Sequence, residues 1–293
     1  MSSGEPAGRG RRIGLGIQGL TVMTDAKSLL EAGRLGAAIE TLVGEVKANP
    51  SDVARRTSLF EALCFAGEWD RAERQLDVIG HQSAKAEMGV QVYRNNIKAE
   101  RDRQRLFSQG LQPHFLSEPP PYVDTNLSAL NRRREGNLAE ARALLERAEE
   151  ERLALAGTLN GKTFEDFRDS DDWVGPALEL IVHDKYTWVP FEQVRRFEVA
   201  PPRQLRDLIW ASARVEVLDG TIGEVFVPAL YAGSHEHPDE QVRLGRMSDW
   251  KPLGEGLYAA AGLRMFLVDG EERPLFEGRT VEFGAAGGRG QGA

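Results

Sequence analysis

Apolar residues recur at helical spacing in the first half of the chain. Between residues 35 and 46 they fall at i, i+3, i+4 and i+7, at Leu35, Ala38, Ile39, Leu42, Val43 and Val46. This spacing places one apolar stripe on a helix. Gly33 precedes the stripe, and glycine favours the left-handed position that ends a helix. Pro50 follows it and pushes Asn49 out of the α region. The pattern predicts two helices joined at Gly33.

The same pattern returns 34 residues later and again near residue 136. Ala32-Gly33, Leu35, Ala38 and Leu42 correspond to Ala66-Gly67, Trp69, Ala72 and Leu76, and then to Gly136, Leu138, Ala141 and Leu145. This period, with small residues at fixed helix positions, is typical of tetratricopeptide (TPR) repeats. We therefore predict a TPR-like array of helical hairpins over 24–157. Its expected helices are 25–32, 35–48, 52–66, 69–79, 84–109, 122–134 and 137–155.

After Gly157 the apolar segments shorten to strand length. Strands are expected at 187–191, 196–199, 213–218, 224–230, 263–268 and 275–283, with a short helix over 173–182. Asp219-Gly220 and Asp269-Gly270 are typical hairpin turns. We predict a second, small α+β domain of antiparallel strands over 158–283, for which a small barrel is one possible form.

The two ends hold few residues that could form a core. Residues 1–23 and 284–293 are expected to be disordered extensions, because they cannot bury enough apolar area to offset chain entropy. Met23 stands directly before Thr24-Asp25, which would cap the first helix, so Met23 is an alternative start of the protein.

Charge and cysteine content exclude several classes of protein. The net charge is -8, and residues 158–293 carry 15 basic and 23 acidic side chains. An acidic half argues against a nucleic-acid surface, which needs a basic footprint. Cys64 is the single cysteine, so an intramolecular disulfide is excluded and a reducing cytoplasm is expected. No apolar run is long enough to predict a membrane span.

Two clusters resemble metal sites. His235 and His237, with His183, would supply the ligands of a metal-dependent hydrolase, but one strand-like segment offers two ligands at most, and a solvated loop is favoured. Asp169, Asp171 and Asp172 lack the glycine and the glutamate of a calcium loop, so we expect Asp171 or Asp172 to cap the helix near Trp173. Arg132-Arg133-Arg134 is expected to complement a helix C-terminus. The sequence predicts no catalytic residue, cofactor or metal.

Several separated motifs of the second half resemble those of one family. In chain order they are Gly175-Pro176-x-Leu178-Glu179, Tyr186-x-Trp188-Val189-Pro190-Phe191-Glu192, Pro201-Pro202-Arg203-x-Leu205-Arg206-Asp207-Leu208-x-Trp210, Tyr231-x-Gly233-Ser234 and Leu244-Gly245-Arg246. Together with the preceding repeats they resemble the ImpE family, also called TagJ, over about residues 24–283. The apolar members of these motifs are expected in the core.

This resemblance implies a non-enzymatic cytoplasmic accessory protein of the bacterial type VI secretion system. Members of the family bind an N-terminal helix of the small contractile-sheath subunit (TssB-type). They are thereby linked to sheath recycling by the ClpV-type AAA+ unfoldase. A general TPR-like peptide-binding cochaperone is the alternative from the binding class, and the metal-dependent hydrolase is the alternative from the enzymes.

The repeat geometry predicts where a helical ligand would bind. In this repeat class the first helix of each hairpin lines the concave side, here 52–66 and 122–134, and 84–109 would close one wall. Helix-in-groove recognition places an apolar helix face in such a channel. We expect Arg56, Leu59, Tyr93 and Asn126 to contact the ligand.

Overall fold

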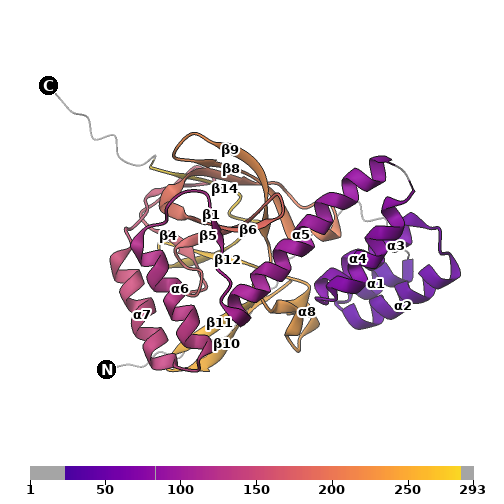
Figure 1. Ribbon diagram of the computed structural model, residues 1–293, viewed down its shortest axis with the longest axis horizontal. Helices are drawn as coiled ribbons and strands as arrows, with labels where there is room; N and C mark the ends of the chain where they lie inside the picture. The colour runs from indigo at the N-terminus through magenta and orange to yellow at the C-terminus, as the bar shows by residue number, and fades with distance from the viewer. Residues whose placement is uncertain (1–23, 83, 285–293) are drawn as a thin grey trace.

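Helices occupy the first half of the molecule and strands most of the second (Figure 1). The computed structural model describes residues 24–82 and 84–284, so the expected disorder of residues 1–23 and 285–293 lies outside it. The expected cap at Thr24-Asp25 also falls outside it, because the side chains of these two residues are not described. The molecule is elongated, with a four-helix lobe at one end, the sheets in the middle and a second helical hairpin at the other end. No helix in the described ranges is long and apolar enough to cross a membrane.

The four-helix lobe confirms the first two predicted hairpins. Its helices are α1 (Thr24–Glu31), α2 (Leu35–Ala48), α3 (Val53–Phe65) and α4 (Trp69–Gly80). Gly33 and Gly67 join the helices of each hairpin with φ of 74° and 69°, the left-handed conformation that favours glycine. The Asp52 carboxylate caps α3 by accepting from the Arg55 amide at 3.1 Å. The repeated small residues Ala38 and Ala72 are fully buried where helices approach each other.

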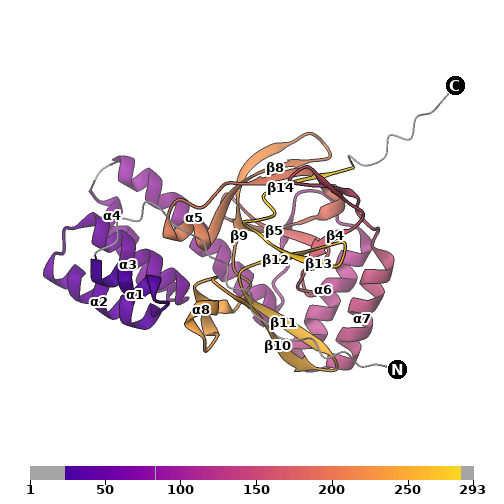
Figure 2. The ribbon, with the colours of Figure 1, turned by 180° about the vertical axis from the view of Figure 1, so that it is seen from behind.

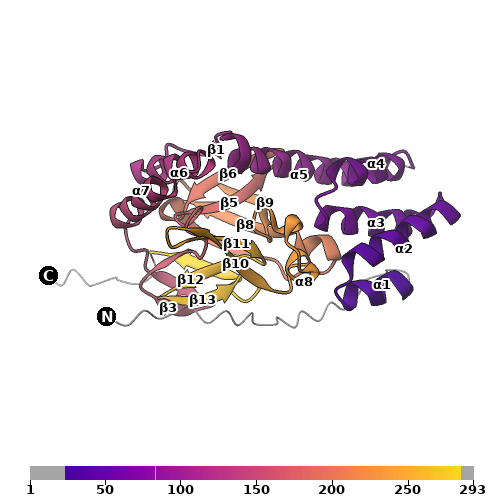
Figure 3. The same cartoon turned by 90° about the horizontal axis from the view of Figure 1, so that it is seen from below.

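The third hairpin exists, but it does not stack on the first two. It is formed by α6 (Pro121–Arg134) and α7 (Leu138–Glu151), and α5 (Ala84–Gln109) separates it from the lobe. With 26 residues, α5 is about 39 Å long. Figures 1 and 3 show α1–α4 and α6–α7 near its opposite ends. The predicted array of helices is therefore confirmed, and it is interrupted between its second and third hairpins because α5 runs on past the lobe to pack on the sheet.

The strands form one large sheet and two small ones. The large sheet has the order β1-β6-β5-β9-β8-β7-β14-β2-β3 and is antiparallel except for the β1–β6 pair. Its strands are β1 (His114–Phe115), β2 (Gly157–Leu159), β3 (Lys162–Phe164), β5 (Ala177–Val182), β6 (Lys185–Pro190), β7 (Val194–Val199), β8 (Trp210–Val217), β9 (Ile222–Pro228) and β14 (Thr280–Phe283). Its end strands β1 and β3 are not paired with each other, so this sheet does not close into a barrel.

The smaller sheets cover one side of the large one (Figure 3). The three-stranded sheet joins β4 (Phe167–Asp169), β12 (Met265–Val268) and β13 (Glu271–Pro274), and the two-stranded sheet joins β10 (Ser248–Gly254) and β11 (Leu257–Gly262). Rings from both larger sheets meet between them, at Phe164, Phe167, Phe191, Phe197, Phe266 and Phe283. Both predicted Asp-Gly turns connect antiparallel strands.

One sequence-based expectation for this half was wrong, and one hairpin was missed. Residues 173–182 are a turn followed by strand β5 rather than a helix. Ala177–Val182 is apolar at nearly every position because it is buried between β6 and β9, and such a short run has no helical or strand periodicity to distinguish it. The β10–β11 hairpin was not predicted. Exposed and half-buried positions of β10 alternate regularly only over its first four residues, so the pattern of a strand is weak.

Candidate interaction surfaces

The side of the lobe that faces the sheets is covered by the protein itself. The 3₁₀ helix η2 (Leu205–Leu208) lies against α3, and Arg206 donates to the Glu61 carboxylate and to the Tyr93 hydroxyl, both at 2.6 Å. The Trp210 ring lies 6.4 Å from Phe60, 6.3 Å from Trp69 and 6.1 Å from Tyr93, centroid to centroid. The face that would receive a peptide in a TPR array therefore contacts η2 and the start of β8.

A second segment of the C-terminal half caps the first hairpin. It holds η3 (Ser234–Glu236) and α8 (Glu240–Arg243). The Glu240 carboxylate accepts from the Gly36 amide in the first turn of α2 at 2.7 Å. Arg246 donates to the carbonyls of Leu30 and Glu31 at the end of α1. A carboxylate at a helix N-terminus and a cation at a C-terminus both match the helix dipole, so this segment stabilises the ends of two helices distant in sequence.

The turn glycines show how closely that segment approaches. A Cβ added at Gly67 would lie 2.3 Å from the His235 ring, and one added at Gly33 would lie 1.6 Å from the Gln241 side-chain nitrogen. At Gly136, the equivalent turn of the third hairpin, no atom lies within 4 Å of such a Cβ. Two of the three repeat glycines thus combine turn geometry with interdomain packing.

The structure does not bring the four predicted groove residues together. Leu59 is 3% exposed, and Tyr93 accepts from Arg206. Arg56 donates to the Pro50 carbonyl and to the Gln75 side chain. Asn126 lies on α6, near the other end of α5, where it donates to the Asp172 carbonyl at 3.0 Å. That these four bind a ligand stays a prediction, and such a ligand would have to compete with contacts inside the chain.

A buried cluster of charged residues joins α5 to the sheets. Arg103 on α5 donates to both Glu179 carboxylate oxygens at 2.8 and 2.9 Å. Arg264 donates to Glu179 and to Asp169, and the Tyr186 hydroxyl also donates to Glu179. Burial by itself would raise the pKa of Glu179, but the two guanidinium groups lower it to about 2. The expected core positions are also confirmed, since Trp188, Phe191, Leu205, Leu208 and Trp210 are all buried.

Sequence reasoning singled out Glu179 only as part of a motif, and it missed Arg103 and Arg264. An arginine within an otherwise charged helix carries no sign that it is buried. Nothing in the sequence showed that Asp169 is fully buried and pairs with Arg264. Asp171 accepts from the Trp173 amide at 3.4 Å within a turn rather than at a helix start.

The histidines also have roles inside the fold. The His237 Nε2 atom lies 3.0 Å from the Asp249 carboxylate, and His235 packs against Gly67. His183 occupies the β5–β6 turn with φ of 57°. Over residues 24–82 and 84–284, no group of three or more His, Cys, Asp or Glu side chains is placed to hold a metal ion.

The three arginines at the C-terminus of α6 each contact a neighbouring side chain. Arg132 pairs with Glu135 and Glu140 at 2.5 and 3.0 Å, Arg133 lies 4.6 Å above the Trp173 ring, and Arg134 donates to Asn131. These contacts leave little of the run for an acidic partner.

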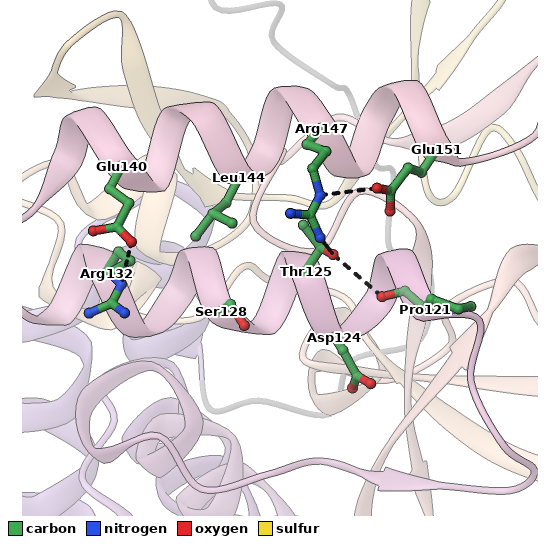
Figure 4. Close-up of a pocket in the computed structure, with 9 residues that line it drawn as sticks. All are labelled: Pro121, Asp124, Thr125, Ser128, Arg132, Glu140, Leu144, Arg147 and Glu151. Atoms are coloured by element: carbon green, nitrogen blue, oxygen red, sulfur yellow. Dashed lines mark hydrogen bonds and ion pairs between the residues drawn. The ribbon is translucent and has the colours of Figure 1, made fainter.

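Two surfaces remain open where the helical array stops. One is the outer face of the third hairpin, a groove of about 550 Å³ between α6 and α7. Figure 4 shows Leu144, Thr125 and Ser128 in its middle, with ion pairs at both ends. Since only one large apolar side chain lines it, it offers little area for an apolar ligand face.

The other open surface is the first part of α5, which extends beyond the sheets. We call it the α5 overhang and define it as Ala84, Met88, Gln91, Val92 and Asn95. Val92, Ala99 and Leu106 follow at intervals of seven on one helix face. Ala99 and Leu106 are buried, whereas Val92 is 39% exposed and Met88 is 75% exposed. The first half of α5 therefore buries Val90 and packs against α4, while Met88 and Val92 on the overhang are left exposed.

Comparison with known proteins gives consistent matches. The family model described as "ImpE protein" matches residues 161–282. The chain is 36% identical over 279 residues to the type VI secretion system accessory component TagJ of Pseudomonas aeruginosa, covering 95% of this chain and 98% of that protein. It also resembles the crystal structure of the protein VPA1032 from Vibrio parahaemolyticus, with a TM-score of 0.82 at 26% identity over 89% of this chain and 97% of that one. Sequence and fold agree over almost the whole length.

Proposed function

The chain belongs to the ImpE/TagJ family of type VI secretion accessory proteins, and from this premise we propose that it binds an amphipathic helix of the small contractile-sheath subunit (TssB-type) on the α5 overhang. The proposed role is that of a non-enzymatic cytoplasmic adaptor. By holding the sheath subunit it would link contracted sheath to recycling by the ClpV-type unfoldase.

The exposure of two apolar side chains one turn apart on α5, Met88 and Val92, is the observation that carries this proposal. In each complete hairpin of the lobe a second helix packs along the first, as α2 does on α1 and α4 on α3. After α5 the chain continues into β1, so α5 has no such second helix of its own. A helix from a partner could take that place, with Met88 and Val92 as its apolar contacts, because helix-in-groove binding uses anchors at i and i+4. Methionine adapts its shape to such a partner.

The concave side of the lobe is already covered by η2 and Trp210, which also favours binding on the α5 overhang. A peptide bound there would have to displace Arg206 from the buried Glu61 carboxylate, and leaving a buried charge unpaired is costly. The overhang needs no such displacement. An adaptor is also favoured over a general cochaperone, since the exposed face is narrow and suits a single helix.

The test is a titration of a labelled peptide that spans the N-terminal helix of the small sheath subunit. Met88→Glu and Val92→Glu are each expected to weaken binding about 30-fold, the effect of losing about 2 kcal/mol at an apolar anchor. Leu153→Glu is the matched control, because Leu153 is equally apolar and 70% exposed but lies beyond α7. If both overhang variants bind like the original protein while Arg56→Ala does not, the ligand occupies the concave groove instead.

A further inference from the structure

Met88 is the most exposed of the large apolar side chains in residues 24–82 and 84–284. It is 75% exposed, and it lies in the first part of α5, on the end of the helix that extends beyond the sheets (Figure 1). Its side chain therefore touches little of its own fold, and its thioether sulfur is open to small molecules in solution.

The other sulfur atoms that the structure describes are better shielded. Met265 is 7% exposed within β12, which lies between β4 and β13, and Met247 is half-buried. Cys64 is 2% exposed, and burial raises the pKa of its thiol well above the ordinary value, so it offers no reactive thiolate. Because oxidants attack exposed thioethers and thiolates first, Met88 is the described sulfur that a mild oxidant reaches most easily.

Oxidation changes the character of the surface that Met88 forms with Val92. A thioether is apolar and adapts its shape to a partner. A sulfoxide is polar, and its oxygen needs a hydrogen-bond donor. Val92, one turn away, and the apolar face of a partner helix offer no such donor. A sulfoxide covered by that face would lose its water without gaining a hydrogen bond, which costs free energy.

We propose that Met88 is a site of reversible oxidation that weakens binding on the α5 overhang, an inference that rests on the proposed function. A sulfur lone pair attacks one oxygen of hydrogen peroxide, so that an S–O bond forms and the O–O bond breaks. The second oxygen leaves as water, with both protons. The sulfur loses two electrons and the peroxide gains them. A methionine sulfoxide reductase restores the thioether with electrons from two thiols, releasing water and a disulfide.

The first measurement locates the modification on the full chain. The protein is treated with dilute hydrogen peroxide and digested, and mass spectrometry follows the addition of one oxygen to each methionine. Met88 is expected to oxidise at least about fivefold faster than Met247 and Met265, because exposure governs susceptibility. The urea midpoint is expected to stay unchanged when only Met88 is oxidised, since its side chain buries little surface in the fold.

The second measurement follows the labelled sheath-subunit peptide, and each protein is compared with itself before and after peroxide. Oxidation is expected to weaken binding about tenfold in the original protein, as expected when a polar group is buried without a partner. Methionine sulfoxide reductase should restore the affinity. Met88→Leu has no sulfur at this position, so peroxide should leave its affinity as it was. Met247→Leu is the matched control and should lose affinity on oxidation as the original protein does.

The outcomes separate this inference from the proposed function. The inference is overturned if Met247 or Met265 oxidises as fast as Met88. It is also overturned, while the proposed function stands, if Met88→Glu weakens peptide binding but oxidation of Met88 does not. If Met88→Glu and Val92→Glu both bind the peptide like the original protein, the proposed function fails and the switch fails with it.

Discussion

Arg103 and Arg264 each bring a guanidinium group into the interior, and both meet the Glu179 carboxylate. All three side chains are at most 3% exposed. Burying charges costs free energy unless they are paired and fully hydrogen-bonded, and here Glu179 accepts from two arginines and from Tyr186. At the residue scale, the joint between α5 and the sheets therefore depends on the ionised state of one glutamate.

The contribution of the ionised Glu179 to the free energy of unfolding is expected to be lost as the pH falls from 4.5 to about 2. The ordinary pKa of 4.5 applies to the unfolded chain, and the pKa in the folded protein is about 2. As the pH falls, the unfolded chain takes up the proton first. The stabilisation is thus fully present above pH 4.5 and lost as the pH falls through 2, a total of about 3 kcal/mol. Urea unfolding at a series of pH values measures this loss.

Other buried acids act in the opposite direction and supply the internal control. Burial raises the pKa of Glu100, and burial together with Asp169 raises the pKa of Asp171. The folded protein takes up their protons before the unfolded chain does, so stability is expected to hold or rise as the pH falls from 7 to 4.5. A loss of stability that begins well above pH 5 would contradict the assignment to Glu179.

At the scale of elements, the three repeat glycines have equal backbone conformations and unequal surroundings. Gly67 and Gly136 have φ of 69° and 79°, which costs any other L-residue about 1–2 kcal/mol. His235 packs on Gly67, while Gly136 faces open space. Glycine is therefore required for the turn geometry at all three sites, and for packing against the C-terminal half only at Gly33 and Gly67.

Gly136→Ala is expected to reduce the free energy of unfolding by about 1–2 kcal/mol, the cost of backbone strain alone. Gly67→Ala is expected to cost at least about 1 kcal/mol more, since its Cβ would overlap the His235 ring. Combining Gly67→Ala with His235→Ala should return the cost to that of Gly136→Ala. Equal losses for the two single variants in a denaturant titration would show that η3 does not pack on the α3–α4 turn.

At the scale of the whole molecule, the lobe and the β-rich half are joined by ionic and aromatic contacts. The side chains of Arg206 and Glu61 are 19% and 4% exposed, and Trp210 stacks among rings of α3, α4 and α5. The TPR-like lobe thus uses its concave side to hold its own C-terminal half. Met88 and Val92 of the α5 overhang stay exposed, and it is there that we propose a partner helix binds.

A double-mutant cycle measures the coupling energy between Arg206 and Glu61 at this contact. Arg206→Ala is expected to cost about 3–5 kcal/mol, because it leaves the Glu61 carboxylate buried without its partner. Adding Glu61→Gln removes that charge, so the double variant should lose clearly less than the sum of the two single variants. Arg195→Ala, which breaks a pair with Glu216 that is more exposed, is the control and should cost at most about 1 kcal/mol. The joint is not energetically coupled if the two single effects simply add.

The sequence by itself determined the helical hairpins and the family. Helical stripes such as Leu35 to Val46 and the repeated glycines specify hairpins through contacts between residues three or four apart, which periodicity reports directly. The order of the motifs around Trp188 and Trp210 identified the family, and the apolar members of these motifs are buried because they are too large and apolar to be left in water.

Only the tertiary structure decided how these parts meet. Glu179 pairs with an arginine 76 residues earlier, and Glu240 caps a helix that begins 205 residues before it. Neither partner leaves a periodic signal in the chain, because such pairs depend on which surfaces come together after the helices and strands have formed. For the same reason nothing in the sequence showed that η2 and Trp210 lie against α3 and α5 on the side of the lobe where a peptide was predicted.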